Sequence, residues 1–114
     1  PGPPRPRLSE PPPPAMRIVC VSDTHGWHRE VPVPDGDLLL HAGDITRKGE
    51  LDTVREFDAW LGALPHRHKV VICGNHDFCF QEQPQAARAL ITNAVYLEDA
   101  AVAVGGLTVY GSPW

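Results

Sequence analysis

Three short, largely apolar runs, each followed at once by a cluster of polar side chains, constrain the fold of this chain most. The runs cover residues 18–21, 38–42 and 69–73. They are nearly continuous, whereas a strand with one solvent-exposed face alternates between apolar and polar residues. Continuous apolar strands of this length are typical of a parallel sheet that is covered on both faces. The pattern therefore predicts an α/β fold that begins with a βαβ unit.

The segment between the second and third runs has the periodicity of an amphipathic helix. Charged residues occupy one side of it, and the apolar residues recur every three or four positions: Leu51, Val54, Phe57, Leu61 and Leu64. Pro65 ends this helix, because proline cannot continue the backbone hydrogen-bond pattern. We expect a second, shorter helix over residues 83–90.

The C-terminal part of the chain has the pattern of short strands. These strands are expected at residues 95–97, 101–104 and 107–110. Gly105-Gly106 separates the last two, and a glycine pair between strand-like runs is typical of a tight hairpin. We therefore expect the chain to change from parallel to antiparallel β-structure after the second helix.

The first fifteen of the 114 residues differ in composition from the rest. They hold eight of the thirteen prolines and almost no apolar side chains. Proline lacks a backbone donor, and such a segment cannot form a core, so residues 1–15 are expected to be a disordered, extended leader. One domain of residues 16–114 then remains, which is near the small end of single domains.

Charge and hydropathy exclude several kinds of partner. The net charge is −4, with ten scattered basic residues, so the chain has no polycationic face. Extended nucleic-acid binding is therefore not expected, while small phosphorylated substrates remain open. No apolar run approaches bilayer length and the leader lacks the apolar stretch of a signal peptide, so we expect no membrane contact and a cytoplasmic location.

The three cysteines are an odd number, and two of them fall within expected buried strands. Cys20 and Cys73 lie in those strands, and Cys79 follows shortly after. This placement favours reduced thiols that pack in the core over disulfides.

The polar clusters after the three runs are Asp23-Thr24-His25, Gly43-Asp44 and Gly74-Asn75-His76-Asp77. In an open α/β sheet, the loops that follow successive strands meet at the carboxyl edge, where ligands bind. Asp23, His25, Asp44, Asn75 and His76 are thus expected to share one pocket. Carboxylate, amide and imidazole groups suit divalent cations such as manganese, iron, zinc or magnesium. The alternative is that Asp23, Asp44 and Asn75 are ordinary turn and helix-capping residues.

This donor set also indicates a reaction. A carboxylate has two oxygens, so Asp44, in the middle of the set, can bridge two ions. Two ions that share a water lower its pKa and clamp the attacking and leaving oxygens of a displacement at phosphorus. The chemistry that these residues predict is phosphoester hydrolysis by a dinuclear metal centre.

The ordered motifs resemble those of the calcineurin-like metallophosphoesterase superfamily, whose signature is Asp-x-His, then Gly-Asp, then Gly-Asn-His-Asp/Glu. Here 17 residues separate His25 from Gly43, and 29 separate Asp44 from Gly74. The residues around the motifs, together with the late Gly111-Ser112-Pro113-Trp114, are most similar to those of the branch called metallophosphoesterase domain-containing proteins. The resemblance covers Arg17 to Trp114. It implies an α/β fold of two packed β-sheets flanked by helices, of which this chain holds the N-terminal part.

The resemblance also implies roles for individual residues. Asp23 and His25 would bind the first metal, Asp44 would bridge both metals, and Asn75 would bind the second. His76 would lie beside the scissile phosphate and protonate the leaving oxygen or stabilise developing charge. Asp77 would hold the His76 ring in the required tautomer.

One departure from the family pattern limits this expectation. The family completes its metal site with histidines from a Gly-His segment and a Gly-His-x-His segment, and no histidine follows His76 here. We expect the 114-residue chain to bind metal weakly and to hydrolyse esters poorly or not at all, because a loosened site misplaces the reacting groups.

Two functions therefore stay open. The first is the N-terminal part of a phosphodiesterase for small phosphodiesters such as cyclic nucleotides, a substrate class taken from the resemblance. The second is a non-catalytic fragment that binds a metal or a partner through the same pocket. Nucleotide binding by a Rossmann-like half domain is disfavoured, because residues 22–26 carry no glycine-rich phosphate loop. The oligomeric state stays open.

Other residues near the motifs have less specific readings. His41 is expected to be a structural, hydrogen-bonded histidine, and the remaining histidines, His28, His66 and His68, to be solvated surface groups. Packing on the sheet edge is favoured for Trp27, with stacking on a nucleobase as the alternative. The basic side chains near the ligands are read as surface charge that can attract phosphate: Arg29, Arg47 and Lys48.

Overall fold

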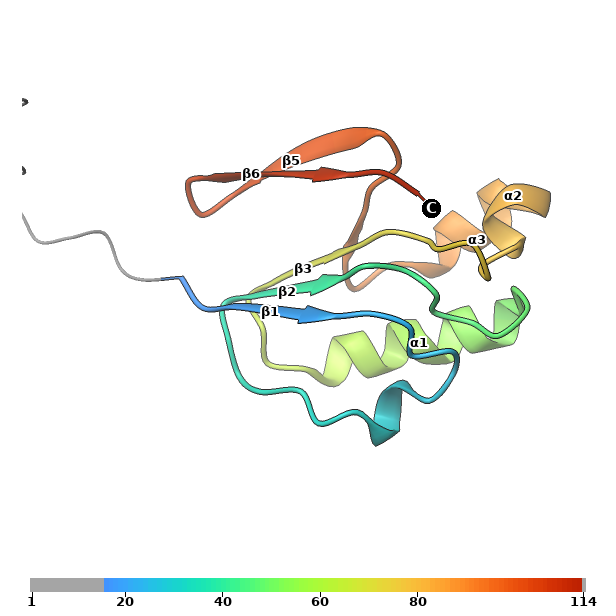
Figure 1. Ribbon diagram of the computed structural model, residues 1–114, viewed down its shortest axis with the longest axis horizontal. Coiled ribbons are helices and arrows are strands. Elements are labelled where there is room, and N and C mark those ends of the chain that lie inside the picture. Colours follow the sequence, from blue (N-terminus) through green and yellow to red (C-terminus); the bar gives the residue numbers. More distant parts are fainter. Residues whose placement is uncertain (1–15, 114) are drawn as a thin grey trace, which may run out of the picture.

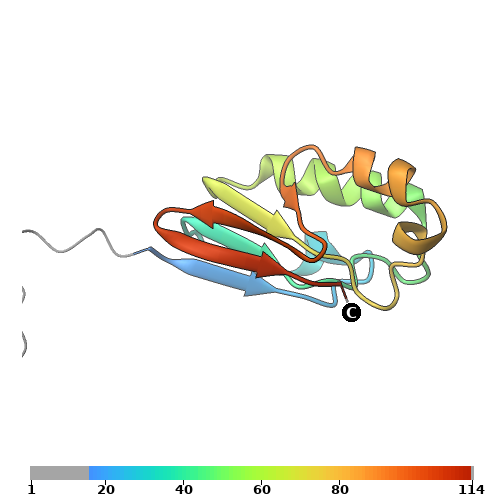
Figure 2. The ribbon, with the colours of Figure 1, turned by 90° about the horizontal axis from the view of Figure 1, so that it is seen from above.

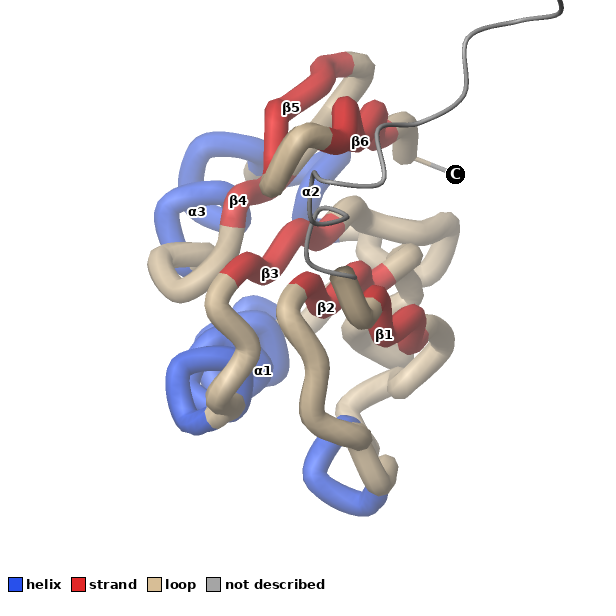
Figure 3. Tube along the Cα trace, turned by 90° about the vertical axis from the view of Figure 1, so that its left-hand side faces the viewer, coloured by secondary structure: helices blue, strands red, loops and turns tan. Residues whose placement is uncertain are grey.

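A computed structural model describes residues 16–113, which form three layers (Figure 1). A β-hairpin lies on one face of a four-stranded sheet, and helices cover the other face (Figure 3). The leader expected at residues 1–15 lies outside the described residues. Within residues 16–113, no helix has the length and apolar character needed to cross a membrane.

The central sheet is parallel throughout, as the apolar runs predict for its first three strands. Its order follows the sequence, with strands β1 (Ile18–Val21), β2 (Leu38–His41), β3 (His68–Val71) and β4 (Val95–Tyr96). The expected change to antiparallel structure is confirmed, but it comes only after the first of the three C-terminal strands, because β4 still pairs parallel to β3. The helices α2 (Cys79–Glu82) and α3 (Pro84–Leu90) carry the chain back to the starting edge, so β4 runs in the direction of β3.

Helix α1 (Leu51–Ala63) covers the sheet as the predicted crossover between β2 and β3. Val54, Phe57 and Leu61 are fully buried and pack with Leu39 and Val71 of the sheet. The helix ends just before Pro65, and the Lys69 ammonium donates to the carbonyls of Leu61 at 2.5 Å and Leu64 at 2.7 Å. A cation at this end of the helix satisfies carbonyls that have no intrahelical partner.

The hairpin consists of β5 (Ala100–Val104) and β6 (Leu107–Gly111), which pair antiparallel as predicted. Val104 packs with Leu38, Val70 and Leu97 in a second core between hairpin and sheet, and Figure 2 shows the hairpin lying over the sheet. Cys20 on β1 is exposed, so the expectation of a buried thiol there is wrong.

Two histidines expected at the surface are instead buried. His28 opens the short 3-10 helix η1 (His28–Glu30), and its side chain is 1% exposed, with its Nε2 bonded to Glu56 of α1. His66 is 4% exposed and its Nε2 donates to the Pro34 carbonyl at 2.9 Å. Sequence neighbours gave no indication of these contacts, because both partners lie about 30 residues away along the chain.

Candidate metal centre

The three polar clusters meet at the carboxyl edge of the sheet, where β1, β2 and β3 end (Figure 1). The loop after β1 runs beside the loop after β2 and continues the parallel pairing. The Asp23 amide donates to the Gly43 carbonyl at 2.9 Å, the His25 amide to the Asp44 carbonyl at 3.0 Å. These backbone bonds fix two segments that carry carboxylates and imidazole at adjacent positions.

Three of the candidate ligands adopt a backbone conformation that L-residues rarely use. Asp23, His25 and Asp44 have φ angles of 57°, 44° and 57°, and within residues 16–113 the other non-glycine residue with positive φ is Asp99. Such conformations cost free energy and persist where surrounding contacts hold them, often at functional sites. The backbone bonds between the two loops supply that support.

The side chains of these three residues offer ligand atoms that lie within 4.8 Å of one another. His25 Nε2 is 3.7 Å from Asp23 Oδ1. Ligands of one ion, at about 2.0–2.2 Å from it, lie at most about 4.4 Å apart, so small side-chain movements close this group around a cation. The donor set, two carboxylates and an imidazole, fits a divalent metal ion.

Contacts behind the ligands orient them for this role. His25 Nδ1 lies 2.9 Å from the Thr46 carbonyl, to which it donates, so Nε2 keeps its lone pair for an ion. The Ser22 hydroxyl donates to Asp23 Oδ2 at 2.6 Å. This hydrogen bond is the largest cause that lowers the pKa of Asp23, which favours the charged form that binds cations.

Asn75 lies directly against the carboxylate of Asp44. The amide atom that faces this carboxylate is 3.1 Å from Oδ1 and 3.2 Å from Oδ2. With nitrogen in that position the amide donates to Asp44. With oxygen there, the amide oxygen and the two carboxylate oxygens face one another, and a cation between them would relieve their repulsion. This pair therefore also fits a metal ion.

His76 joins the same group from the loop after β3. Its ring makes an edge contact with His25 at 5.0 Å between centroids, and its amide donates to Asp44 Oδ1 at 3.0 Å. The imidazole Nδ1 donates to the Arg47 carbonyl at 3.2 Å. The structure therefore brings Asp23, His25, Asp44, Asn75 and His76 together, and their roles in metal binding and catalysis stay predictions.

Asp77 does not make the contact that the resemblance implies. Its carboxylate is 1% exposed and accepts hydrogen bonds from the backbone amides of Thr46 at 2.8 Å, Gly74 at 2.9 Å and Ile45 at 3.0 Å. The tautomer of His76 is held by the Arg47 carbonyl instead. The Asp77 carboxylate accepts from backbone amides that would otherwise be buried without partners. It thereby connects the loop after β2 to the loop after β3.

The close approach of these two loops requires glycine. A Cβ at Gly74 would lie 2.2 Å from Asp44 Oδ1, and a Cβ at Gly43 would lie 2.7 Å from the Gly74 nitrogen. Either side chain would push Asp44 away from its neighbours, so the glycines of both motifs follow from packing and not only from turn geometry.

Thr46 is a site residue that sequence reasoning missed. Its hydroxyl lies 2.8 Å from Asp77 Oδ1 and 3.1 Å from the His76 carbonyl, and it accepts a bond from the Gly49 amide at 2.7 Å. It thereby links the loop after β2, the loop after β3 and the entry to α1. A threonine two residues after a Gly-Asp pair has no distinctive pattern of its own, so no sequence signal marked it.

The expected structural role of His41 is confirmed. The ring is 2% exposed, its Nδ1 accepts from the Gly43 amide at 3.2 Å, and its Nε2 donates to the Thr24 hydroxyl at 3.0 Å. Burial lowers the pKa of His41 to about 4, so the ring is neutral near neutral pH and cannot act as a surface base.

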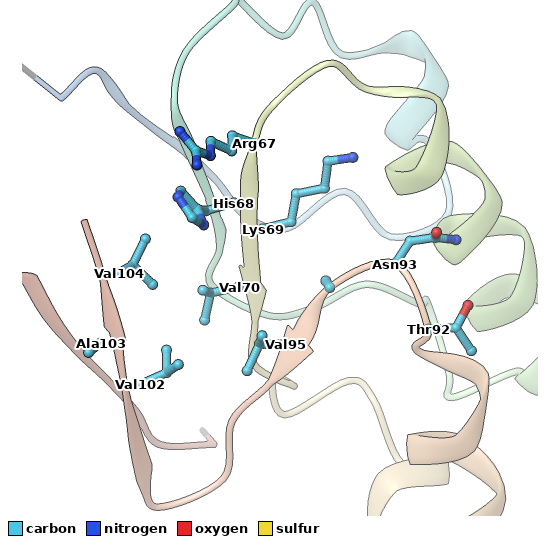
Figure 4. A pocket seen from close by; sticks show the side chains of 11 residues that line it. Arg67, His68, Lys69, Val70, Thr92, Asn93, Val95, Val102, Ala103 and Val104 are labelled. Atoms are coloured by element: carbon cyan, nitrogen blue, oxygen red, sulfur yellow. The ribbon is translucent and has the colours of Figure 1, made fainter.

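One cavity among the described residues lies away from this site. It has a volume of about 420 Å³ and opens beside the amino end of β3, between the sheet and the hairpin (Figure 4). Its lining includes Arg67, His68, Val70, Val95 and Val104. The candidate metal centre is instead an open, polar edge, which suits a charged substrate that reaches its ligands from solvent.

A parallel α/β sheet whose carboxyl edge gathers two aspartates, an asparagine and two histidines is typical of α/β proteins that can hold divalent metal ions at the strand ends. Residues 16–112 match the model of the family described as calcineurin-like phosphoesterase, and the chain belongs to this family. The predicted family and the predicted partial fold are both confirmed.

Curated proteins similar to this chain are longer than it. Metallophosphoesterase domain-containing protein 1 of Homo sapiens, like that of Mus musculus, is 38% identical over 134 residues, which cover 97% of this chain and 41% of that protein. A UPF0046 protein of Caenorhabditis elegans is 40% identical over 116 residues, covering 87% of this chain and 41% of that protein. The chain thus spans about two fifths of the length of these relatives.

Proposed function

We propose that this chain forms part of a metal-dependent phosphoesterase and supplies the carboxyl-edge ligands of a dinuclear centre. Asp23 and His25 would hold one ion, Asp44 would lie between two ions, and Asn75 would hold the second. The observation that carries this proposal is the convergence of ligand atoms from Asp23, His25 and Asp44 within 4.8 Å. Membership of the calcineurin-like phosphoesterase family supports it.

Two divalent cations in this position would lower the pKa of a water and neutralise charge on a phosphoryl group. The chain's own residues would supply orientation and a proton. His76 donates through Nδ1 to the Arg47 carbonyl, so its Nε2 is the atom available to a ligand. In the doubly protonated form, Nε2–H would donate to the leaving oxygen as the ester bond breaks.

The surroundings of the site support a small anionic substrate. Arg47 and Lys48 are exposed on the loop that holds the His76 ring. Cations beside a metal centre attract phosphate. A net charge of −4 with scattered basic residues does not favour extended nucleic acid. We propose small phosphodiesters, including cyclic nucleotides, as substrates, manganese among the suitable metals, and the cytoplasm as the location.

The two ion positions are unequal within residues 16–113. Asp23, His25 and Asp44 would contact the first ion, whereas Asp44 and Asn75 are the ligands that the described part offers to the second. Each ligand that water replaces weakens affinity and loosens the position of the reacting groups. We propose that the 114-residue chain binds the first ion more tightly than the second and turns over slowly.

Metal content and hydrolysis of bis-p-nitrophenyl phosphate with added manganese test the proposal. We expect Asp44→Ala to lose most of the manganese that the parent chain retains, and any turnover with it, since both ions would lose a ligand. Asp52→Ala is the matched control, because Asp52 is an exposed aspartate on α1 whose partner is Arg55. Equal manganese content in the parent chain and Asp44→Ala would refute the shared site. Metal binding without turnover would favour the non-catalytic alternative.

A further inference from the structure

Two of the three exposed aromatic side chains within residues 16–113 belong to the loops that carry the site histidines. Trp27 is 62% exposed and Phe78 is 44% exposed, and the third, Tyr110, lies on the hairpin. Trp27 comes two residues after His25, and Phe78 comes two residues after His76. Because two residues span at most about 7 Å of chain, each aromatic begins close to a site histidine. The two histidine rings are themselves in contact.

The sequence favoured packing on the sheet edge for Trp27, and this expectation is wrong. The residue belongs to neither apolar core, although its neighbour His28 is buried against Phe57 and Trp60 with ring centroids 5.4 Å and 5.1 Å apart.

Phe78 likewise stays at the surface, while Phe80 fills the core and stacks on Tyr96 with ring centroids 4.9 Å apart. In both loops, then, one aromatic residue fills the core and another, Trp27 or Phe78, is exposed to solvent.

The backbone on which each aromatic sits is held firmly. The Trp27 amide donates to the Thr24 carbonyl at 2.6 Å, and the Trp27 carbonyl accepts from the Glu30 amide at 2.9 Å. The buried His28 anchors the chain immediately after it. Phe78 follows the buried Asp77 and precedes the buried Cys79. With the backbone held, only the side-chain torsions of each ring would have to become ordered when it binds a ligand.

We propose that Trp27, with Phe78 on the opposite loop, binds a flat aromatic ester group of the phosphodiester, either aryl or nucleobase. This inference rests on the proposed function, because the phosphoryl group would sit at Asp23, His25 and Asp44 and place its ester groups beside these rings. An aromatic pair gains stabilisation beyond the area that it buries, so flat rings are preferred over saturated rings of similar size.

Binding of two phosphate monoesters in the presence of manganese tests the inference without turnover. Phenyl phosphate and cyclohexyl phosphate share the phosphoryl group and differ in whether the ring is flat. We expect calorimetry on the full chain to show phenyl phosphate binding about two- to tenfold more tightly than cyclohexyl phosphate. Trp27→Ala should weaken phenyl phosphate binding about fivefold or more, since stacking is lost. Trp27→Phe should retain most of the affinity for phenyl phosphate.

One control variant tests specificity, and the dependence of binding on Asp44 separates this inference from the proposed function. Leu107→Ala removes a side chain that is 41% exposed at the hairpin turn, and should leave both affinities unchanged. Binding that depends on Asp44 but is equal for the two esters, or insensitive to Trp27→Ala, would overturn the aromatic role alone. If neither ester binds in a manner that depends on Asp44, the proposed function is overturned, and this inference with it.

Discussion

Asp77 acts on the candidate metal centre through the main chain. Its carboxylate accepts hydrogen bonds from the backbone amides of residues 45 and 46, which follow the candidate ligand Asp44, and of residue 74, which precedes Asn75. A buried carboxylate with several backbone donors is stabilised, whereas the donors left behind when it is removed are buried without partners. The aspartate of the fourth motif position is thus explained by loop geometry rather than by contact with His76.

Substitution of Asp77 should therefore affect stability, while substitution of His76 should affect function. We expect Asp77→Ala to lower the free energy of unfolding by about 3 kcal/mol or more, because three buried amides lose their acceptor. His76→Gln, at an exposed ring, should change it by less than about 0.5 kcal/mol. Urea unfolding of both variants measures this difference. A large loss of stability in His76→Gln, or none in Asp77→Ala, would contradict the assignment.

At the level of elements, the carboxyl ends of β1 and β2 are joined by a buried histidine as well as by the sheet. His41 ends β2 and contacts the Thr24 hydroxyl in the loop after β1 and the amide of Gly43 in its own loop. Its ring also meets Phe57 of α1 at 4.8 Å between centroids. The neutral ring satisfies a donor and an acceptor at once, and a protonated ring could not accept from Gly43.

This clamp makes stability depend on pH. Burial lowers the pKa of His41 from 6.5 to about 4, so between these values the unfolded chain binds more protons than the folded chain. The contribution is complete above about pH 6.5 and is lost as pH falls toward 4, amounting to about 3 kcal/mol in all.

Unfolding free energies at pH 7.5 and 4.5 measure this contribution. We expect His41→Gln to reduce the difference between the two pH values by about 2–3 kcal/mol relative to the parent chain. The comparison within each protein removes the effect of the substitution on overall stability. The same pH dependence in both proteins would show that His41 does not titrate on unfolding as described.

At the level of the whole molecule, the sequence predicts most elements but not how they face one another. The runs at residues 18–21 and 69–73 were recognisable because they are apolar almost throughout, and α1 because its apolar face repeats at helical spacing. The motif residues converge as expected because carboxyl ends of parallel strands share one edge. The directions of short segments and the partners of isolated polar residues depend on contacts between distant parts of the chain.

β4 and His28 illustrate this limit. β4 has two residues, too few to show a pattern, and its direction follows from the path of the preceding helices. His28 is polar and lies among polar neighbours, yet its burial depends on Glu56 and two aromatic rings of α1. Cys20 is exposed for a related reason, because the hairpin does not cover β1 fully, and Ile18 on the same strand is 44% exposed.

The reactivity of the three thiols can be used to test which parts of the sheet are covered. Cys73 and Cys79 are buried, and desolvation raises the pKa of both thiols, that of Cys79 to about 11. We expect one thiol per folded chain, Cys20, to react readily with an aromatic disulfide reagent, and three to react in urea. Cys20→Ser should remove the fast reaction. More than one fast thiol in the folded chain would contradict the burial of the other two.

The left-handed backbone conformation of Asp23, His25 and Asp44 lowers the stability of the fold, while their side chains supply the candidate ligand atoms. Glycine at any of these positions would relieve the conformational cost while deleting a donor atom. Selection for heat resistance alone would therefore favour replacements at the positions that supply the candidate ligands. Substitutions intended to raise the thermal stability of this chain should therefore leave these three residues unchanged and be made elsewhere, for instance on the exposed side of β1.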